Sequence, residues 1–240
     1  MESNKRAIKA LITLVLTVLI LFFLERKFLV AQIRGETLIN YGKIKWLDKI
    51  VLLIDDFEGL KSDSISIQQV GFFGYGSAKI SLDSSQIDNN MIASKTCLKV
   101  IWNGKDSYGG WGKGVGKNID INTLTDYINF RIYVPTSNGK TDSIKISLEE
   151  DDNASGVLEH DKDDSWFYKL KISSADKWQF ISIPLKDFVD ANVGGDSVLN
   201  ITRKGGLHTI IFSFEEADKY TPHHKWYFDF ICITNGKIYN

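Results

Sequence analysis

Cysteine is scarce in this chain of 240 residues, which contains only Cys97 and Cys232. Two cysteines are too few for a disulfide framework, and they are not spaced as the ligands of a zinc site. They could form a single bridge or remain two separate buried thiols. The fold must therefore rest on a hydrophobic core, and a chain of this length with 43% hydrophobic residues can build one.

An excess of positive charge is also lacking. The 29 lysines and arginines are balanced by 30 acidic residues, and the formal net charge is −1. Binding to phosphate backbones requires clustered basic residues, and none are clustered beyond the N-terminus. We therefore expect no nucleic-acid partner.

Recognisable catalytic motifs are missing as well. The glycine-rich stretch 109–118, GGWGKGVGKN, fits neither a phosphate-binding loop nor a dinucleotide fingerprint, and we expect its glycines to shape a turn. The segment 74–78, GYGSA, is not a nucleophile elbow. His223 and His224 are adjacent and would point to opposite sides of a strand. Sequence spacing selects no pair of glycosidase carboxylates, so the sequence predicts no enzyme.

The N-terminus contains the one long hydrophobic run. Residues 10–24, ALITLVLTVLILFFL, follow Lys5, Arg6 and Lys9. Fifteen residues are fewer than the ~20 that span a bilayer, but Lys9 can snorkel and lengthen the usable segment. This predicts a transmembrane signal anchor at 1–27, a linker at 28–47 and a globular domain at 48–240. The alternative is a cleaved signal peptide, although LVAQ at 29–32 is a poor cleavage site. The basic N-terminal flank places the domain outside the cytoplasm.

The rest of the chain has the pattern of β-strands. Seven segments alternate with period two or are rich in β-branched and aromatic residues, namely 96–102, 127–134, 143–150, 166–172, 178–185, 208–216 and 226–234. They are separated by turn sequences such as TSNGKTD and RKGG. This predicts an all-β sandwich of two antiparallel sheets. Outside the anchor we expect no helix beyond one or two turns, the best candidate being IPLKDFVD at 183–190.

An ordered set of motifs resembles a known family. LLIDDFEG (52–59), YGGWGKGV (108–115), DYINFRIYV with SIKISLEEDD, WFYKLKISSADKWQFISIPLKDF, and TIIFSF with YFDFICI occur in the order found in the family 11 carbohydrate-binding modules. The same arrangement occurs in the domain of complex I intermediate-associated proteins. The resemblance covers about residues 50 to 235. It implies a galactose-binding-like jelly roll with structural calcium and a concave, aromatic-lined face that binds a glucan chain.

The resemblance also implies metal ligands. In such jelly rolls an acid from the first strand and one from the last commonly meet at a calcium ion, which points to Glu58 and Asp229. Asp56 shares strand parity with Glu58 and is a third candidate. Calcium takes six to eight oxygen ligands, so carboxylates are the right chemistry. The alternative is that Asp55 and Asp56 form a solvated turn and that Asp229 is a surface residue.

Candidate ligand-binding residues follow from the same comparison. Tyr75 falls where glucan-binding members carry a stacking tyrosine, and Tyr108 or Trp111 could supply a second ring; the alternative is packing within loops. Phe214 stands in place of a tyrosine on the penultimate strand. Trp102, Trp166 and Trp178 lie in strand patterns, which favours packing.

Eight carboxylates lie among the sixteen residues from 149 to 164. Most of them are expected in a solvated loop. Glu149 and Asp151 share strand parity at the end of SIKISLEEDD, so one of them is expected to face the binding groove.

Two functions therefore remain from the sequence. The first is a membrane-anchored, extracytoplasmic and non-catalytic module that binds a polysaccharide or other glycan, with calcium in a structural role. The second is a protein-interaction or assembly module with a protein partner, as the complex I intermediate-associated resemblance implies. Exposed aromatic rings beside an acid would favour sugar, whereas a flat apolar patch would favour a protein.

Overall fold

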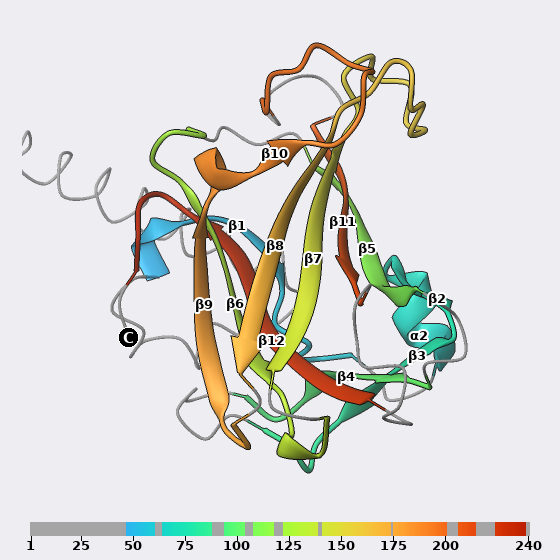
Figure 1. The fold of residues 1–240 in the computed structure, drawn as a ribbon, viewed down its shortest axis with the longest axis vertical. Coiled ribbons are helices and arrows are strands. Elements are labelled where there is room, and N and C mark those ends of the chain that lie inside the picture. The colour runs from blue at the N-terminus through green and yellow to red at the C-terminus, as the bar shows by residue number, and fades with distance from the viewer. Residues whose placement is uncertain are drawn as a thin grey trace, which may run out of the picture. The chain divides into compact units, whose positions relative to one another are not determined.

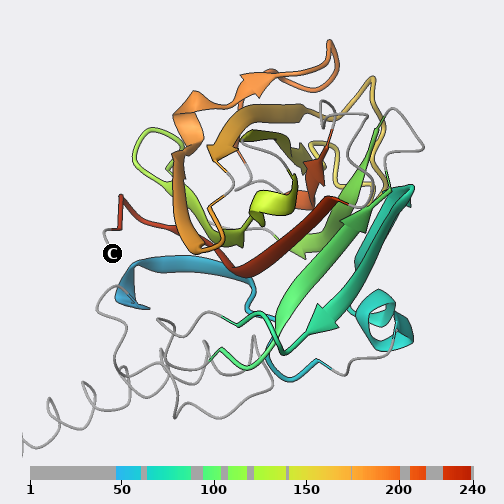
Figure 2. The ribbon, with the colours of Figure 1, turned by 60° about the horizontal axis from the view of Figure 1, so that its bottom comes forward.

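The computed structural model describes residues 47–60, 64–87, 94–103, 108–117, 122–138, 141–173, 175–200, 206–214 and 224–238. The predicted anchor at 1–27, and all but the last residue of the predicted linker, lie outside these ranges. The described residues form two six-stranded antiparallel sheets packed against each other (Figures 1 and 2). The predicted all-β, two-sheet sandwich is confirmed.

Sheet A has the order β3-β4-β12-β6-β9, and β1 pairs with the end of β12. The first and last strands of the sandwich are therefore neighbours. The strand bounds are β1 Ile50–Asp55, β3 Ala78–Asp83, β4 Cys97–Trp102, β6 Tyr127–Tyr133, β9 Trp178–Pro184 and β12 His224–Thr234.

Sheet B has the order β10-β8-β7-β11-β5-β2. Its strand bounds are β2 Phe72–Gly76, β5 Gly109–Lys117, β7 Thr141–Glu150, β8 Ser165–Ser173, β10 Val189–Asp190 and β11 Leu207–Ser213. All seven strands predicted from alternation are present, with ends that differ by at most three residues.

The core lies between the sheets and is strongly aromatic. Trp111 of β5 stacks on Phe212 of β11 with ring centroids 4.6 Å apart, and Phe228 of β12 meets Trp111 edge-on at 5.0 Å. Phe214 stacks on Trp226 at 3.8 Å. The first contact lies within sheet B and the other two join the two sheets; burial of this apolar area is expected to supply most of the stability.

Helices contribute little to the described structure. The bounds are α2 Ser64–Gln69 and the 3-10 turns η1 Leu47–Lys49, η2 Thr136–Asn138 and η3 Leu185–Asp187. The expected short helix in IPLKDFVD is the single turn η3, whereas no pattern in the sequence indicated α2. Among the described residues, no helix is long and apolar enough to cross a membrane.

The prediction that the glycine-rich stretch 109–118 forms a turn is wrong. Residues 109–117 form β5, which pairs with β2 on one side and β11 on the other. Glycines at alternate positions produce no hydrophobic alternation, so the strand is not visible in the sequence. The two cysteines are separate and buried, which is one of the two interpretations left open by the sequence.

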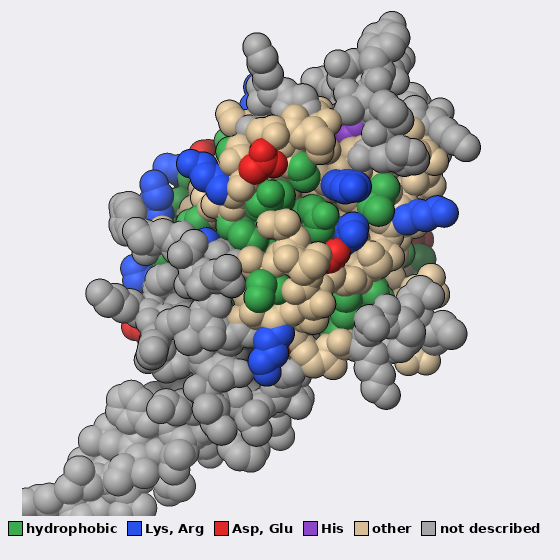
Figure 3. All heavy atoms as spheres, turned by 90° about the horizontal axis from the view of Figure 1, so that it is seen from below, with side chains coloured by type: hydrophobic (Ala, Val, Ile, Leu, Met, Phe, Trp, Pro, Cys, Tyr) green, Lys and Arg blue, Asp and Glu red, His purple; other side chains and the backbone are tan. Residues whose placement is uncertain are grey.

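The surface seen from the side of β3 and β4 carries mixed side chains. Figure 3 shows hydrophobic side chains in the middle of this face, with lysines or arginines around them and few acidic groups. The acid-rich stretch 149–164 instead spans the last residues of β7 and the loop after it, at the end of sheet B from which the longest described loops project (Figure 1).

Candidate functional site: the outer face of sheet B

The face of sheet B that points away from the core is lined by small residues and aromatic rings. Strand parity assigns to it Phe73 and Tyr75 of β2, Gly110, Gly112 and Gly114 of β5, Thr209, Ile211 and Ser213 of β11, and Ser147 and Glu149 of β7. We call this surface the glycine face. Tyr108 immediately precedes β5 and has the same parity as its even-numbered glycines.

Two aromatic rings of β2 lie over the glycines of β5. Tyr75 is paired with Gly110, which is itself paired with Ser213, and the Tyr75 hydroxyl donates to Ser213 Oγ at 2.6 Å. The ring thus crosses the bare backbone of Gly110. A Cβ added at Gly110 would lie 2.7 Å from the tyrosine oxygen, and one added at Gly112 would lie 3.0 Å from Cε1 of Phe73. Glycine is required at both positions because the rings, together with the backbone carbonyl oxygens of Phe212 and Ile210, occupy the space of a side chain.

Three rings form a short row on this face. The centroids of Phe73 and Tyr75 are 6.5 Å apart, and those of Tyr75 and Tyr108 are 6.4 Å apart. Phe73 remains 38% exposed and Tyr108 58% exposed. Aromatic surface that stays in contact with water at a sheet face is a typical element of a binding site, since it becomes desolvated only when a ligand covers it.

Some of the predicted ligand residues lie on the outer face of sheet B, and others point into the core. Tyr75 and Tyr108 lie in the row of rings. Trp111 and Phe214 have no exposed surface and are packed into the core, so the expectation that they contact a ligand is wrong. Trp102 is buried as expected. Sequence reasoning missed Phe73, although its parity with Tyr75 would have identified it once 72–76 had been assigned as a strand.

Polar groups adjoin the rings along the same face. Glu149 pairs with Thr209 and with Ser165, whose Oγ donates to Glu149 Oε1 at 3.3 Å. Its other oxygen, Oε2, is buried and accepts no hydrogen bond from the part of the chain that the structure describes. Burial raises the pKa of Glu149.

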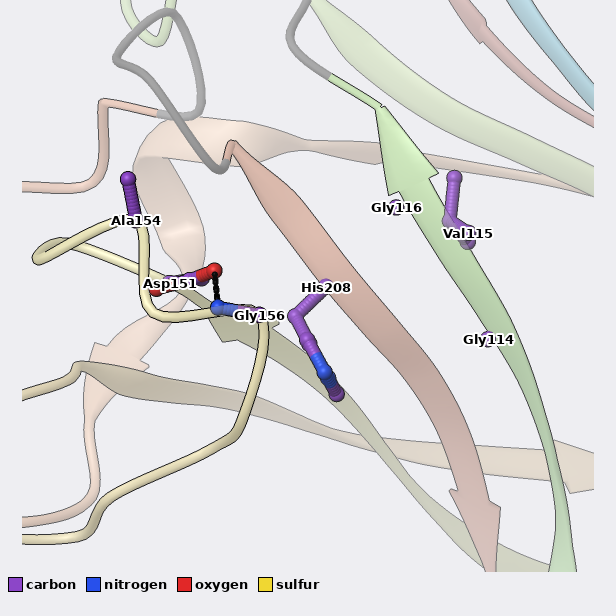
Figure 4. A pocket seen from close by; sticks show the side chains of 7 residues that line it. All are labelled: Gly114, Val115, Gly116, Asp151, Ala154, Gly156 and His208. Atoms are coloured by element: carbon purple, nitrogen blue, oxygen red, sulfur yellow. Dashed lines mark hydrogen bonds between the residues drawn. The ribbon is translucent and has the colours of Figure 1, made fainter.

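A hollow of about 620 Å³ adjoins the face beyond Gly112. Figure 4 shows Gly114, Val115 and Gly116 of β5 on one side, the loop residues Asp151, Ala154 and Gly156 on the other, and His208 between them. Asp151 is one of the two acids predicted to face the groove, and it does line the hollow. Its two oxygens, however, accept the amides of Ser155 at 3.0 Å and Gly156 at 2.8 Å, so the carboxylate shapes the loop.

A separate group of acids lies where β1 meets β12. Glu58 Oε1 accepts the backbone amides of Lys95 and Thr96, and Asp229 Oδ2 accepts the Ser94 hydroxyl at 2.7 Å. Burial, with smaller effects from the charges of Glu58 and Asp56, raises the pKa of Asp229 to about 8. Asp56 and Asp229 are buried, so the alternative of a solvated turn and a surface residue is wrong. Asp55 is instead ion-paired with Lys113.

The backbone is strained beside these acids. Phe57, between Asp56 and Glu58, has φ 58°, and Phe230, directly after Asp229, has φ 49°. Positive φ is unfavourable for bulky residues and persists only where the surroundings enforce it. At Phe230 it accompanies a register shift of β12 against β6 between Asp229 and Cys232. Both distortions lie next to the acids that the sequence predicts as metal ligands.

A second acidic group is absent from the sequence-based predictions. Glu150, Asp152 and Asp164 each offer a ligand oxygen, and these oxygens lie within 4.8 Å of one another. Within the described ranges, no other set of three His, Cys, Asp or Glu residues is grouped in this way. Burial, then the charges of Asp152 and Asp164, raise the pKa of Glu150 to about 8. Burial and neighbouring acids also raise the pKa of Asp152, to about 6. This cluster could hold a metal ion such as calcium. The acids are visible in the sequence, but their proximity is not, because it depends on the pairing of β7 with β8.

Comparison with solved structures identifies the fold. The chain is similar to the family 11 carbohydrate-binding module from Clostridium thermocellum, solved in complex with a β-1,3-1,4-mixed-linked tetrasaccharide, with a TM-score of 0.51 and 20% identity over 78% of this chain and 96% of that one. A solution structure of CtCBM11 matches with a TM-score of 0.53 and 18% identity, with the same coverage. The fold is thus that of the family 11 modules, as the sequence resemblance indicated.

The same fold also occurs inside enzymes. An exo-β-agarase matches with a TM-score of 0.52 and 13% identity over 79% of this chain, but the match covers only 25% of the agarase. No protein-family model and no curated protein sequence matches the chain. These likenesses define the fold, and the function must be argued from the site.

Proposed function

We propose that this protein is a non-catalytic carbohydrate-binding module that holds a polysaccharide on the glycine face. The observation that carries the proposal is the row formed by Phe73, Tyr75 and Tyr108 over the glycines of β5. Sugar rings present flat C–H surfaces, and exposed aromatic rings in a row match a chain of such surfaces. The likeness to family 11 modules supports the same function.

The polar part of the glycine face suits the hydroxyl groups of a sugar. Ser147, Thr209 and Ser213 place small polar side chains beside the rings, and Glu149 Oε2 accepts no hydrogen bond from the described residues. This oxygen is buried, so the side chains over it would have to move before a sugar hydroxyl could donate to it. Because the family 11 relative was solved with a mixed-linked tetrasaccharide, mixed-linked β-glucan is the first ligand to test.

A calcium ion at the junction of β1 and β12 is part of the proposal. Glu58 and Asp229 would hold it, with Asp56 as a third ligand. The chemistry of these residues suits a cation. Asp229 is deeply buried and lies next to two other acids, and a cation would stabilise its charged form. The ion would join the first strand of the sandwich to the last.

The proposed function also includes a membrane anchor that holds the globular domain outside the cytoplasm. It rests on the apolar run at residues 10–24 and its basic N-terminal flank. An anchored module would keep its bound polysaccharide at the cell surface.

The test is affinity electrophoresis of the full-length chain, in mild detergent, through gels containing mixed-linked β-glucan. We expect retention of the wild type, and Phe73→Ala and Tyr108→Ala should each weaken binding by about 1–3 kcal/mol, the general range for an aromatic anchor. Leu124→Ala, which removes an exposed apolar side chain outside sheet B, is the control and should bind like the wild type.

Two results would refute the proposal. One is no retention by β-glucan or any related polysaccharide, which would favour the protein-interaction function. The other is undiminished retention of both aromatic variants, which would place binding elsewhere.

A further inference from the structure

We propose that Glu150, Asp152 and Asp164 bind a calcium ion, and that this ion fixes the β7–β8 loop, residues 151–164, as the wall of the hollow beside β5. This site is distinct from the calcium proposed at Asp229. The inference does not depend on which ligand the glycine face binds.

The spacing of the three carboxylates suits one ion. Their ligand oxygens lie within 4.8 Å of one another. Oxygens bound to the same calcium lie 2.3–2.6 Å from it, so any two of them are at most about 5 Å apart. The spacing of the three oxygens is therefore compatible with a common ion.

One oxygen of the cluster lacks the partner that burial demands. Asp164 has no exposed surface, and within the described ranges its Oδ1 accepts no hydrogen bond. This atom and Asp152 Oδ2 both lie against the position that a Cβ of Gly195 would occupy, 2.7 Å away for Asp152 Oδ2. The unpartnered oxygen thus faces another carboxylate, an arrangement that a shared cation would stabilise.

Four other oxygens of the cluster accept hydrogen bonds from N–H donors around it. Glu150 accepts the Trp166 indole at 2.7 Å and the Asn200 amide at 2.8 Å. Asp152 Oδ2 accepts the Asp164 amide at 3.0 Å, and Asp164 Oδ2 accepts the Asp196 amide at 3.2 Å. These bonds orient the three carboxylates from the periphery, as outer groups do around metal ligands.

The ligand chemistry selects calcium. No ion pair between described residues involves any of the three acids, so their charge calls for an external cation. Three carboxylates are hard oxygen ligands with no nitrogen or sulfur among them, which disfavours zinc. Magnesium usually keeps several waters and is rarely enclosed by protein groups alone.

The ion would tie together both ends of one loop. Glu150 ends β7, Asp152 is the second residue of the loop, and Asp164 directly precedes β8. Asp151 lies between two of the ligands and lines the hollow with Ala154 and Gly156. Holding both ends of the loop therefore fixes the position of that wall.

The direct test is the amount of calcium bound by the full-length chain. After dialysis against micromolar calcium, elemental analysis of Asp164→Asn should show one ion fewer per chain than the wild type. The matched control Asp161→Asn removes an exposed acid from the same loop and should bind as much as the wild type. Glu150→Gln provides a second variant in case Asp164→Asn folds poorly. The proposal is overturned if both triad variants retain the full wild-type complement of calcium.

Loop fixation has its own readout, since Lys162 is an exposed trypsin site within the loop. Calcium should slow cleavage after Lys162 at least tenfold in the wild type and leave it unchanged in Asp164→Asn. Cleavage after Lys177, an exposed lysine in the bend between β8 and β9, corrects for effects of calcium on trypsin. Equal protection of Lys162 in the wild type and in Asp164→Asn, or no protection in either, would overturn the proposed role of the ion.

Discussion

Trp111 and Tyr108 lie three residues apart in one glycine-rich stretch, yet they have opposite environments. Trp111 is enclosed by Phe212 and Phe228, whereas Tyr108 is more than half exposed. Odd and even positions of β5 point to opposite sides of sheet B, and this alone separates a core residue from a candidate ligand residue. Their substitutions should therefore have opposite effects.

We predict that Trp111→Ala lowers the free energy of unfolding by about 3–5 kcal/mol, the usual cost of truncating a fully buried aromatic side chain. Tyr108→Ala should change it by less than about 0.5 kcal/mol, as expected of a surface substitution. Urea unfolding followed by far-ultraviolet circular dichroism measures both. A small cost at Trp111 would show that the core between the sheets is not packed as described.

Asp83 provides a prediction of pH dependence. Burial opposes its ionisation, but hydrogen bonds from Ser85, from Lys99 and from two backbone amides outweigh burial and lower its pKa to about 2. An acid with a depressed folded-state pKa stabilises the protein above its unfolded value, near 3.8, and loses this contribution as the pH falls toward 2.

We therefore expect Asp83→Asn to cost about 1–2 kcal/mol at pH 7, a value reduced from the full shift because the pair is partly solvated. The difference from the wild type should shrink between about pH 4 and pH 2. Urea unfolding of both proteins at several pH values tests this. A cost that stays constant from neutral pH down to the folded-state pKa would contradict a role for the ionised carboxylate.

At the scale of elements, β5 depends on Gly110 and Gly112, because the rings of Tyr75 and Phe73 lie against their backbone. A methyl group at Gly112 would meet Phe73 and the Ile210 carbonyl oxygen at 2.9 Å, whereas one at Gly114 would find its nearest atom 3.9 Å away. We predict that Gly112→Ala destabilises the fold by about 1–3 kcal/mol, the usual cost of overpacking. Gly114→Ala is the matched control and should be nearly neutral. Thermal melting of the two variants, which differ only in position, decides this prediction.

The same strand shows how far the sequence can be interpreted. Strands such as 127–134 and 226–234 were predictable because they are rich in β-branched and aromatic residues, although the structure buries nearly all of their positions. In β5 the outward positions are glycines, and at Gly110 and Gly112 the lack of space comes partly from Tyr75 and Phe73, more than thirty residues earlier. Likewise, Glu150 and Asp164 meet only after β7 and β8 have paired. Local pattern predicts elements, but contacts between distant residues define this candidate site.

At the scale of the whole molecule, attachment to a membrane is the main expectation that lies outside the described residues. The apolar run at residues 10–24 predicts that the full-length protein remains with membranes after washing in alkaline carbonate. A variant with Leu16→Lys and Leu19→Lys should be released, because charges at the centre of such a segment oppose insertion. Recovery of a shortened soluble chain that begins near Gln32 would instead demonstrate cleavage.

The pairing of β1 with β12 has a mechanical consequence. In a chain held at its N-terminus and attached through sheet B to a polymer, tension enters the sandwich at Ile50 and passes along β1. Within the described part, β1 has β12 as its single ladder partner, and no disulfide joins Cys97 to Cys232. Resistance to pulling is governed by the rate of forced unfolding. The β1–β12 ladder is therefore the element whose rupture would limit how much force the domain withstands.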